Sequence, residues 1–252
     1  MPFTAAGYTH DVFYRGAGPG VVLIPEMPGV HPGVLALGNH LVDNGFTVAI
    51  PSLYGTPGRP AMSPRAIPVL VKGCVAKEFA ALATNTERPV ADYLRALSRD
   101  LNAKTPGPGV GVIGQCFSGG FALAAAVDDS VLAPVLSQPS VPLPLGRTRR
   151  SDPGVSEREL KIIEGRAARE GLCALGLRFS RDPMVPAERF GTLKARLGDN
   201  FEVIELDSAP GNPDGFSRTA HSVLTLEVRE RSGQGAFEAR KRVVEFLTER
   251  LT

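Results

Sequence analysis

Residues 109–127 read GVGVIGQCFSGGFALAAAV, an apolar run that passes through a glycine-flanked cysteine into a helix-forming run. Strand, reactive side chain and helix in this order are typical of a nucleophile elbow, a tight turn that lifts the nucleophile above the edge of a sheet. Such a turn tolerates only small residues two positions before and two positions after the nucleophile. Around Cys116 these are Gly114 and Ser118, so the sequence predicts a cysteine nucleophile where most such elbows carry serine.

A second register of the same turn is centred on Ser118, because residues 116–120 also read small-x-Ser-x-small. We prefer the Cys116 register for two reasons. It places Gly114 two positions before the nucleophile, and it leaves Gly119 and Gly120 for close packing in the first helical turn.

Short apolar runs alternate with segments of helical periodicity along most of the chain. The predicted strands are 21–24, 46–50, 109–113, 131–136, 172–179 and 201–206. The predicted helices are 32–44, 89–101, 121–127, 157–170, 186–197 and 237–251. This alternation predicts an α/β fold, a mostly parallel sheet with helices on both faces. No break in composition divides the chain, so we expect one domain over residues 1–252.

Three stretches interrupt the alternation. Residues 51–68 carry five prolines and two glycines and predict a rigid, irregular excursion, followed by a weakly patterned helical stretch at 69–83. We expect the whole segment 51–88 to cover the pocket over the elbow. Residues 138–156 and 208–220 are predicted to be long loops.

Composition narrows the class of protein. The 252 residues are 43% hydrophobic and 21% charged, with a formal net charge of +2, which is ordinary for a globular protein and gives no sign of a nucleic-acid surface. The densest basic stretch, residues 147–150, is interpreted as a solvated loop. We see no signal-peptide pattern and no apolar run of the roughly 20 residues that span a bilayer. Three cysteines are too few for a disulfide framework and lack metal spacing, so we expect a cytoplasmic protein.

A cysteine nucleophile needs a base to take its proton. Of the four histidines only His221 follows Cys116, in a loop after the last predicted strand, so it is the predicted base. Asp182, in the loop after the strand at 172–179, is the predicted acid that accepts the imidazole N–H and fixes its tautomer. Asp207 and Asp214 are alternatives, since they also precede His221.

Glu26 ends the first apolar strand, at the edge of the sheet where chemistry gathers in open α/β folds. It is either an exposed loop acid or a site residue that faces the nucleophile. The backbone N–H of Phe117 is the first predicted donor to the oxyanion. From the loop of Glu26 we expect Met27 as the second donor, because Pro28 has no N–H.

The remaining histidines and cysteines are expected to be less active. His31 follows this loop and is either a pocket-lining residue or inert, and His40 is interpreted as solvated. Cys74 and Cys173 lie in apolar surroundings and are interpreted as small core residues.

With these residues in place, the chain resembles the dienelactone hydrolase family over most of its length. The resemblance rests on Glu26, on the elbow at 114–120, on Asp182 in the sequence DPMVP and on His221 in AHS. It implies an α/β-hydrolase fold and a triad of Cys116, His221 and Asp182. It also implies that Glu26 holds the resting thiol and helps to form the thiolate when substrate arrives.

The reaction that the resemblance implies is ring opening of an unsaturated lactone through a thioester to the cysteine, followed by hydrolysis. No metal and no organic cofactor is implied. One departure concerns the substrate, because the family grips a substrate carboxylate with arginines, one of them a helical turn after the catalytic histidine. That position is Thr225 here, and a threonine does not replace a bidentate arginine. Arg218 is near in the sequence but lies before His221. Arg59 and Arg65, in the proline-rich excursion, are the other candidates to bind a substrate carboxylate.

We therefore predict an enzyme that hydrolyses a small-molecule ester or lactone, acting as a monomer or small homo-oligomer without nucleic-acid or membrane partners. Two alternatives remain open. One keeps the site but changes the acyl group to another ester or a thioester. The other is a non-catalytic module that binds a carbonyl ligand or senses oxidants through Cys116.

Overall fold

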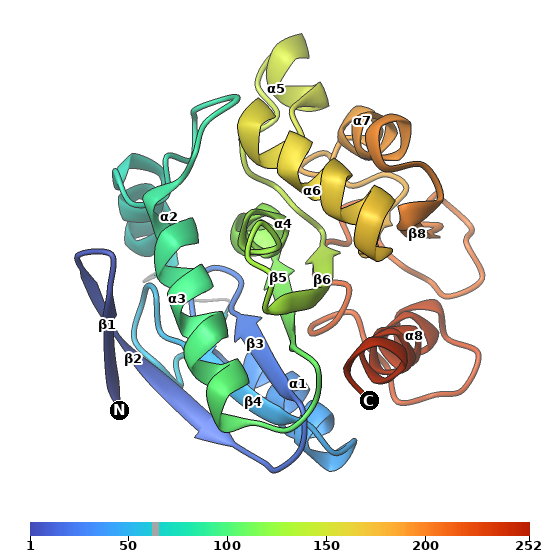
Figure 1. The fold of residues 1–252 in the computed structure, drawn as a ribbon. Helices are drawn as coiled ribbons and strands as arrows, with labels where there is room; N and C mark the ends of the chain where they lie inside the picture. Colours follow the sequence, from blue (N-terminus) through green and yellow to red (C-terminus); the bar gives the residue numbers. More distant parts are fainter. Residues whose placement is uncertain (62–65) are drawn as a thin grey trace.

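The computed structural model describes residues 1–61 and 66–252, and an eight-stranded sheet runs through the middle of that part of the chain (Figure 1). The strand order is β1-β2-β4-β3-β5-β6-β7-β8. The strands are β1 (Pro2–Ala5), β2 (Tyr8–Arg15), β3 (Gly20–Ile24), β4 (Thr47–Pro51), β5 (Val110–Gln115), β6 (Val131–Ser137), β7 (Ala174–Phe179) and β8 (Phe201–Leu206). Strands β3 to β8 pair in parallel, while β1 and β2 form an antiparallel extension at one edge.

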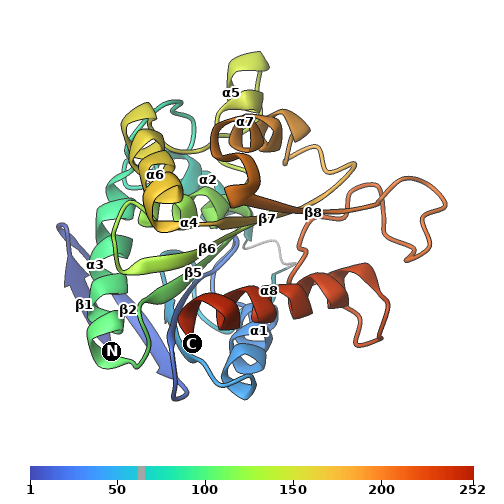
Figure 2. The same cartoon turned by 45° about the vertical axis from the view of Figure 1, so that its right-hand side comes forward.

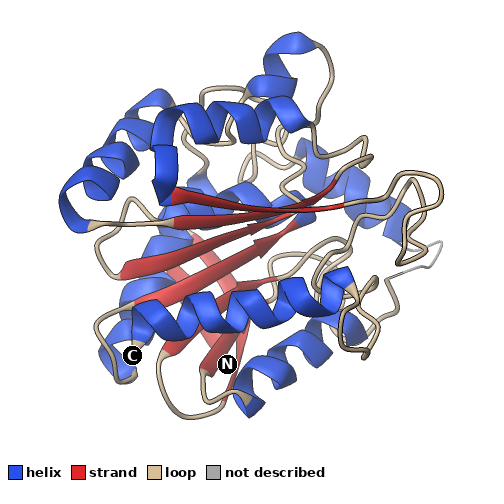
Figure 3. Cartoon of the chain, turned by 90° about the vertical axis from the view of Figure 1, so that its right-hand side faces the viewer, coloured by secondary structure: helices blue, strands red, loops and turns tan. Residues whose placement is uncertain are grey.

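Helices cover both faces of the sheet (Figures 2 and 3). One face carries α3 (Pro89–Lys104), α4 (Gly119–Ala125), α6 (Glu157–Glu170) and α7 (Ala187–Leu197), and the other carries α1 (Pro32–Asp43) and α8 (Gly235–Leu251). Two further helices, α2 (Ala66–Val75) and α5 (Arg147–Ser151), lie in the connections after β4 and β6. The predicted α/β fold with a mostly parallel sheet is confirmed.

The side chains of β5 alternate between two apolar cores. Val110 and Val112 point into the core under α3 and α4, and Ile113 points into the core under α1 and α8. Each such fully buried aliphatic side chain contributes about 1.5–3 kcal/mol through apolar burial. Gly111 lets α8 approach, because a Cβ at this position would lie 2.5 Å from a methyl group of Leu247. The strand that ends at the elbow is therefore among the best-anchored parts of the chain.

Several predicted elements differ from the observed ones. No strand was predicted before residue 21, and the structure adds β1 and β2 there, because exposed antiparallel edge strands lack the continuous apolar run of buried ones. The predicted loop at 138–156 contains the five-residue helix α5, and the helical stretch expected at 69–83 ends at Val75. Within the predicted excursion, residues 62–65 lie outside the described residues.

The loops at the carboxyl ends of β3, β5, β6, β7 and β8 meet at one edge of the sheet, where open α/β folds place their ligands. These loops carry Glu26, Cys116, Ser140, Asp182 and His221. Among the helices that the structure describes, none combines the length and apolar character that a bilayer crossing requires.

Candidate active site

The turn at Cys116 has the geometry of an elbow. Cys116 follows β5 directly and has φ +51°, a left-handed conformation that costs a non-glycine residue on the order of 1 kcal/mol. Residues Cys116–Ser118 form one turn of 3-10 helix, η1, before α4 begins. A Cβ at Gly114 would lie 2.3 Å from the carbonyl oxygen of Ser118, so only glycine fits two positions before the cysteine. The thiol is half-buried.

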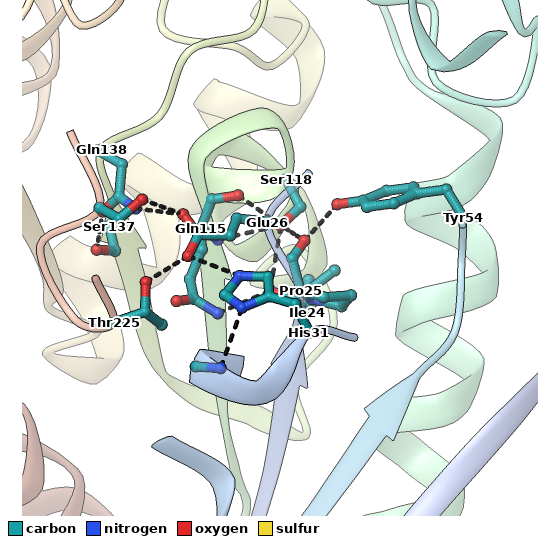
Figure 4. A network of polar contacts seen from close by, with 12 residues as sticks. Ile24, Pro25, Glu26, His31, Tyr54, Gln115, Ser118, Ser137, Gln138 and Thr225 are labelled. Carbon is teal, nitrogen blue, oxygen red and sulfur yellow. Dashed lines mark hydrogen bonds and ion pairs between the residues drawn. The ribbon is translucent and has the colours of Figure 1, made fainter. Parts of the chain in front are cut away.

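The hydroxyl of Ser118, by contrast, is turned into the protein. Ser118 is completely buried, and its Oγ lies 2.9 to 3.2 Å from the carbonyl oxygens of Gln115, Pro25 and Ile24. The backbone N–H of Gln115 donates to the same Oγ at 3.0 Å. The hydroxyl therefore ties the elbow to the end of β3 (Figure 4). This environment favours the register in which Cys116 is the presented side chain.

Asp182 and His221 lie in contact, although 39 residues separate them. Asp182, in the loop after β7, places Oδ2 2.6 Å from Nδ1 of His221, in the loop after β8. The backbone N–H of Met184 donates to the other carboxylate oxygen at 2.9 Å, which fixes the orientation of the carboxylate. Since Nδ1–H donates to Asp182, Nε2 of the imidazole is left for proton exchange with a substrate or with sulfur.

The two alternative acids have other partners. Asp207 accepts the backbone N–H of Ala209 at 2.8 Å, and Asp214 accepts that of Gly235 at 3.0 Å. Among the three predicted acids, Asp182 is the one that the structure places against His221.

The electrostatics of His221 link it to Cys116. Burial lowers the pKa of the imidazole, but the negative charge of the Cys116 sulfur and the hydrogen bonds to Asp182 and Cys116 outweigh burial and raise the pKa to about 11. An imidazole in this position holds its proton at neutral pH whenever the sulfur is ionised. Cys116 and His221 can therefore exchange a proton in the way that a nucleophilic cysteine requires, while Asp182 holds the imidazole.

Glu26 is buried in a network of four donors (Figure 4). Nε2 of His31 donates to Oε1 at 3.2 Å, and Thr225 donates to the same oxygen through its hydroxyl. Ser222 donates to Oε2 at 2.7 Å, and the amide of Gln138 does so at 3.3 Å. Burial raises the pKa of the carboxyl, but the hydrogen bonds from His31, Thr225 and Ser222 prevail and lower it.

These four donors bear on the role expected for Glu26. They occupy both carboxylate oxygens, and the described contacts of Glu26 include no bond to the Cys116 sulfur. Thr225, at the position where the resemblance places an arginine, donates its hydroxyl hydrogen bond to Glu26.

His31 is buried and has both ring nitrogens engaged. Nδ1 accepts the backbone N–H of Gly33 at 3.1 Å, which caps the start of α1 and places the ring proton on Nε2, facing Glu26. Neither nitrogen is left for a substrate, so the geometry assigns His31 a structural place beneath the site. Of the two candidate arginines in the excursion, Arg59 is exposed and Arg65 lies outside the described residues.

The expected oxyanion donors lie on two neighbouring loops. Phe117 is in the first turn of the elbow, where backbone N–H groups have no partner within the helix. Met27 follows Glu26 in the loop after β3, and its side chain packs closely against Gly73 of α2, where a Cβ would lie 2.3 Å from the methionine methyl. Gly73, within segment 51–88, therefore lies against the loop that carries Met27.

Three residues of this region were not predicted from the sequence. Ser140, in the loop after β6, has its Oγ 3.6 Å from the Cys116 sulfur, and its backbone N–H donates to the Cys116 carbonyl at 3.0 Å. Gln138 and Ser222 complete the Glu26 network. A signal was present, because Gln138 and Ser140 follow a predicted strand and Ser222 adjoins the predicted base.

The chain resembles known proteins in both sequence and structure. The sequence model of the dienelactone hydrolase family matches residues 9–251. No curated protein matches the chain. The fold superposes on a dienelactone hydrolase-like promiscuous phosphotriesterase from metagenomic libraries with a TM-score of 0.66 and 17% identity, over 100% of this chain and 97% of that one.

Two further structures share the fold. A dienelactone hydrolase from Anabaena variabilis gives a TM-score of 0.59 at 13% identity, over 100% of this chain and 97% of that one. A cold-adapted esterase from an Arctic intertidal metagenomic library gives 0.61 at 13% identity, over 100% of this chain and 93% of that one. At such identities these likenesses establish the fold, while the family model covers nearly the whole sequence. The resemblance found in the sequence is thereby confirmed: the chain belongs to the dienelactone hydrolase family and is a hydrolase that acts on ester bonds.

Proposed function

We propose that the protein hydrolyses small carboxylic esters or lactones through a thioester intermediate on Cys116. The observation that carries this proposal is the position of His221, whose Nδ1 is held by Asp182 at 2.6 Å while the charge of the Cys116 sulfur bears on the same ring. A cysteine that merely filled space would need neither the left-handed backbone at position 116 nor a buried acid behind the neighbouring imidazole.

The geometry supports the following sequence of steps. Cys116 loses its proton to Nε2 of His221, and the thiolate attacks the carbonyl carbon of the ester. The N–H groups of Phe117 and Met27 stabilise the oxyanion. When the tetrahedral intermediate collapses, the C–O bond breaks and the imidazolium gives its proton to the leaving alkoxide. His221 then takes a proton from water, whose oxygen attacks the thioester and releases the acid and the cysteine.

The contacts of Glu26 support a different role from the one that the family resemblance implies. Both carboxylate oxygens are engaged by His31, Thr225, Ser222 and Gln138. Glu26 thereby joins the loops after β3, β6 and β8. We assign it the positioning of the loop that carries His221, while the thiol proton passes directly to the imidazole.

An uncharged acyl group fits this site better than an anionic one. The hydroxyl of Thr225 is committed to Glu26, and Arg59 is exposed. In addition, the half-buried carboxyl of Glu227 lies near enough to His221 for the two charges to interact. A negative charge that interacts with the imidazole disfavours a substrate carboxylate there.

A mass-spectrometric assay with a chromogenic ester tests this function. We expect a burst of alcohol product and a transient acyl group on Cys116, with Cys116→Ala abolishing both. Cys173→Ala, which removes a buried thiol directly before β7, at the opposite end of that strand from the site, is the matched control and should keep its turnover. A panel that pairs neutral with carboxylate-bearing esters and unsaturated lactones identifies the acyl class.

The non-catalytic alternative rests on the half-buried thiol of Cys116. A carbonyl-binding or oxidant-sensing module would show no turnover on a broad ester panel, yet would form a stable adduct or a sulfenic acid at this cysteine. Turnover that depends on Cys116 excludes that alternative.

A further inference from the structure

We propose that Ser140 is a further catalytic residue, whose hydroxyl donates a hydrogen bond to the Cys116 thiolate and stabilises it before attack. This inference rests on the proposed cysteine mechanism and adds to it a group that acts on the reacting sulfur. The first observation is the contact itself, since Oγ of Ser140 lies 3.6 Å from Sγ of Cys116.

Burial limits the hydrogen-bond partners that the Ser140 hydroxyl can have. Ser140 is 2% exposed, so bulk water does not compete for its proton. Within residues 1–61 and 66–252, the Cys116 sulfur is the hydrogen-bond partner found for this Oγ. A buried hydroxyl costs free energy unless its proton is donated, and a thiolate can only accept. The direction of the bond therefore follows from the ionised state of the sulfur.

The loop around Ser140 is held in place from three sides. Its backbone N–H donates to the Cys116 carbonyl at 3.0 Å, which couples the loop to the elbow. Pro139 lies against the first turn of α4, because a Cβ at Gly119 would come within 2.5 Å of its Cα. Gln138, one residue earlier, holds φ +37° and donates its amide to Glu26.

A fourth support is a buried arginine. Arg189, on α7, is fully buried and donates to the carbonyl oxygens of Pro139 and Pro142, the latter at 2.6 Å. Burying a guanidinium to bind two carbonyls of one short loop is costly unless the contacts are well formed. The hydroxyl of Ser140 is thus fixed before substrate arrives, as a preorganised donor must be.

Other groups that bear on the Cys116 charge stay unchanged when Ser140 is altered. His221, with Asp182 behind it, and the phenol of Tyr54, from the segment after β4, interact with that charge directly, while Glu26 acts on Tyr54 and Glu227 acts on His221. If the pH midpoint of thiolate formation changes when the Ser140 hydroxyl is removed, the change is therefore due to the loss of that hydroxyl.

The test measures the ultraviolet absorbance of the thiolate against pH, as the difference between each protein and its Cys116→Ala counterpart. A hydrogen bond to a charged group is typically strong enough to change an equilibrium by tenfold or more. In Ser140→Ala we expect the midpoint of thiolate formation to rise by about one pH unit. We also expect kcat/KM at neutral pH to fall by about tenfold. Ser98→Ala removes another buried serine hydroxyl, in α3, and should leave both values unchanged.

A second pair of variants tests the inference even if Ser140→Ala does not fold. Ser140→Thr and Ser140→Val add the same methyl group, but only the threonine keeps a hydroxyl. We expect the threonine variant to retain the wild-type midpoint and the valine variant to lose it. A midpoint that is the same in all folded variants of Ser140 overturns the inference, whatever their turnover. Ester turnover that survives in Cys116→Ala overturns the proposed function instead.

Discussion

Ser222, the residue directly after His221, donates its hydroxyl to Oε2 of Glu26 at 2.7 Å. This bond joins the loop after the last strand to the loop after β3, 196 residues earlier in the chain. Thr225 adds a second bond from the same loop to the same carboxylate. The histidine of the site therefore sits on a loop whose position depends on one buried acid.

Glu26→Gln should weaken both the fold and the reaction. The amide offers two donors to an environment that already consists of donors, so about 1–3 kcal/mol of unfolding free energy should be lost. Because the His221 loop loosens, kcat should fall while the nucleophile remains intact. Urea denaturation and steady-state kinetics measure the two effects. A variant with wild-type stability and kcat would show that the network does not position His221.

The stability difference between wild type and Glu26→Gln should also depend on pH. The folded protein holds the pKa of Glu26 below its usual 4.5, so the stabilisation is complete above that pH and is lost as pH falls through the lower folded-state pKa. The difference in unfolding free energy between wild type and Glu26→Gln should shrink in acid. Denaturation curves from neutral pH to below 4.5 test this, and a difference that grows in acid would contradict the assigned cause.

Asp182→Asn should lower the activity and change the alkaline limb of the pH–rate profile. Asp182 contributes to the raised pKa of about 11 at His221, so its removal makes the imidazolium lose its proton at lower pH. We expect kcat/KM to fall by about two to four orders of magnitude. The alkaline limb of the pH–rate profile should shift toward neutrality. Asp207→Asn, in a loop carboxylate with other partners, should keep the wild-type profile.

Ser118→Ala separates the two registers of the elbow. The buried hydroxyl ties the turn to β3, so its loss should cost about 1–3 kcal/mol of stability. The acyl group should still form on Cys116 in the folded variant, because the thiol is untouched. Rapid-quench mass spectrometry checks this. Complete loss of acylation in a protein that remains folded would assign the nucleophile to Ser118.

Gly114→Ala and Gly191→Ala should have opposite effects on stability. A Cβ at Gly114 meets the Ser118 carbonyl at 2.3 Å, so the backbone must shift and the elbow should lose about 2 kcal/mol or more. Gly191 lies exposed inside α7 with no atom within 4 Å of a new Cβ, and alanine should stabilise that helix by about 0.5–1 kcal/mol. Equal effects on the melting temperature would contradict the close packing at the elbow.

Much of the fold was predictable because buried strands and amphipathic helices leave periodic patterns. The predicted strand at 201–206 and helix at 157–170 coincide with β8 and α6. The hairpin of β1 and β2 was not predicted, since its side chains alternate between exposed and partly buried positions at the sheet edge.

The residues of the site could be predicted from the sequence only where a reactive side chain follows the end of a strand. Cys116, Asp182 and His221 each follow an apolar strand, so their meeting could be expected from topology. The partners of Glu26 could not, because Gln138 and Ser222 reach it from loops more than a hundred residues away. The engagement of His31 by Gly33 and Glu26 likewise depends on how one loop folds back on itself.

The most direct test is the mass of the peptide that carries Cys116, measured after a rapid acid quench during ester turnover. We predict an increment equal to the acyl group of the ester, on Cys116 and not on Ser118, which disappears as turnover ends. Turnover that proceeds with no acyl group on Cys116, or that persists in Cys116→Ala, would contradict a mechanism through a cysteine thioester.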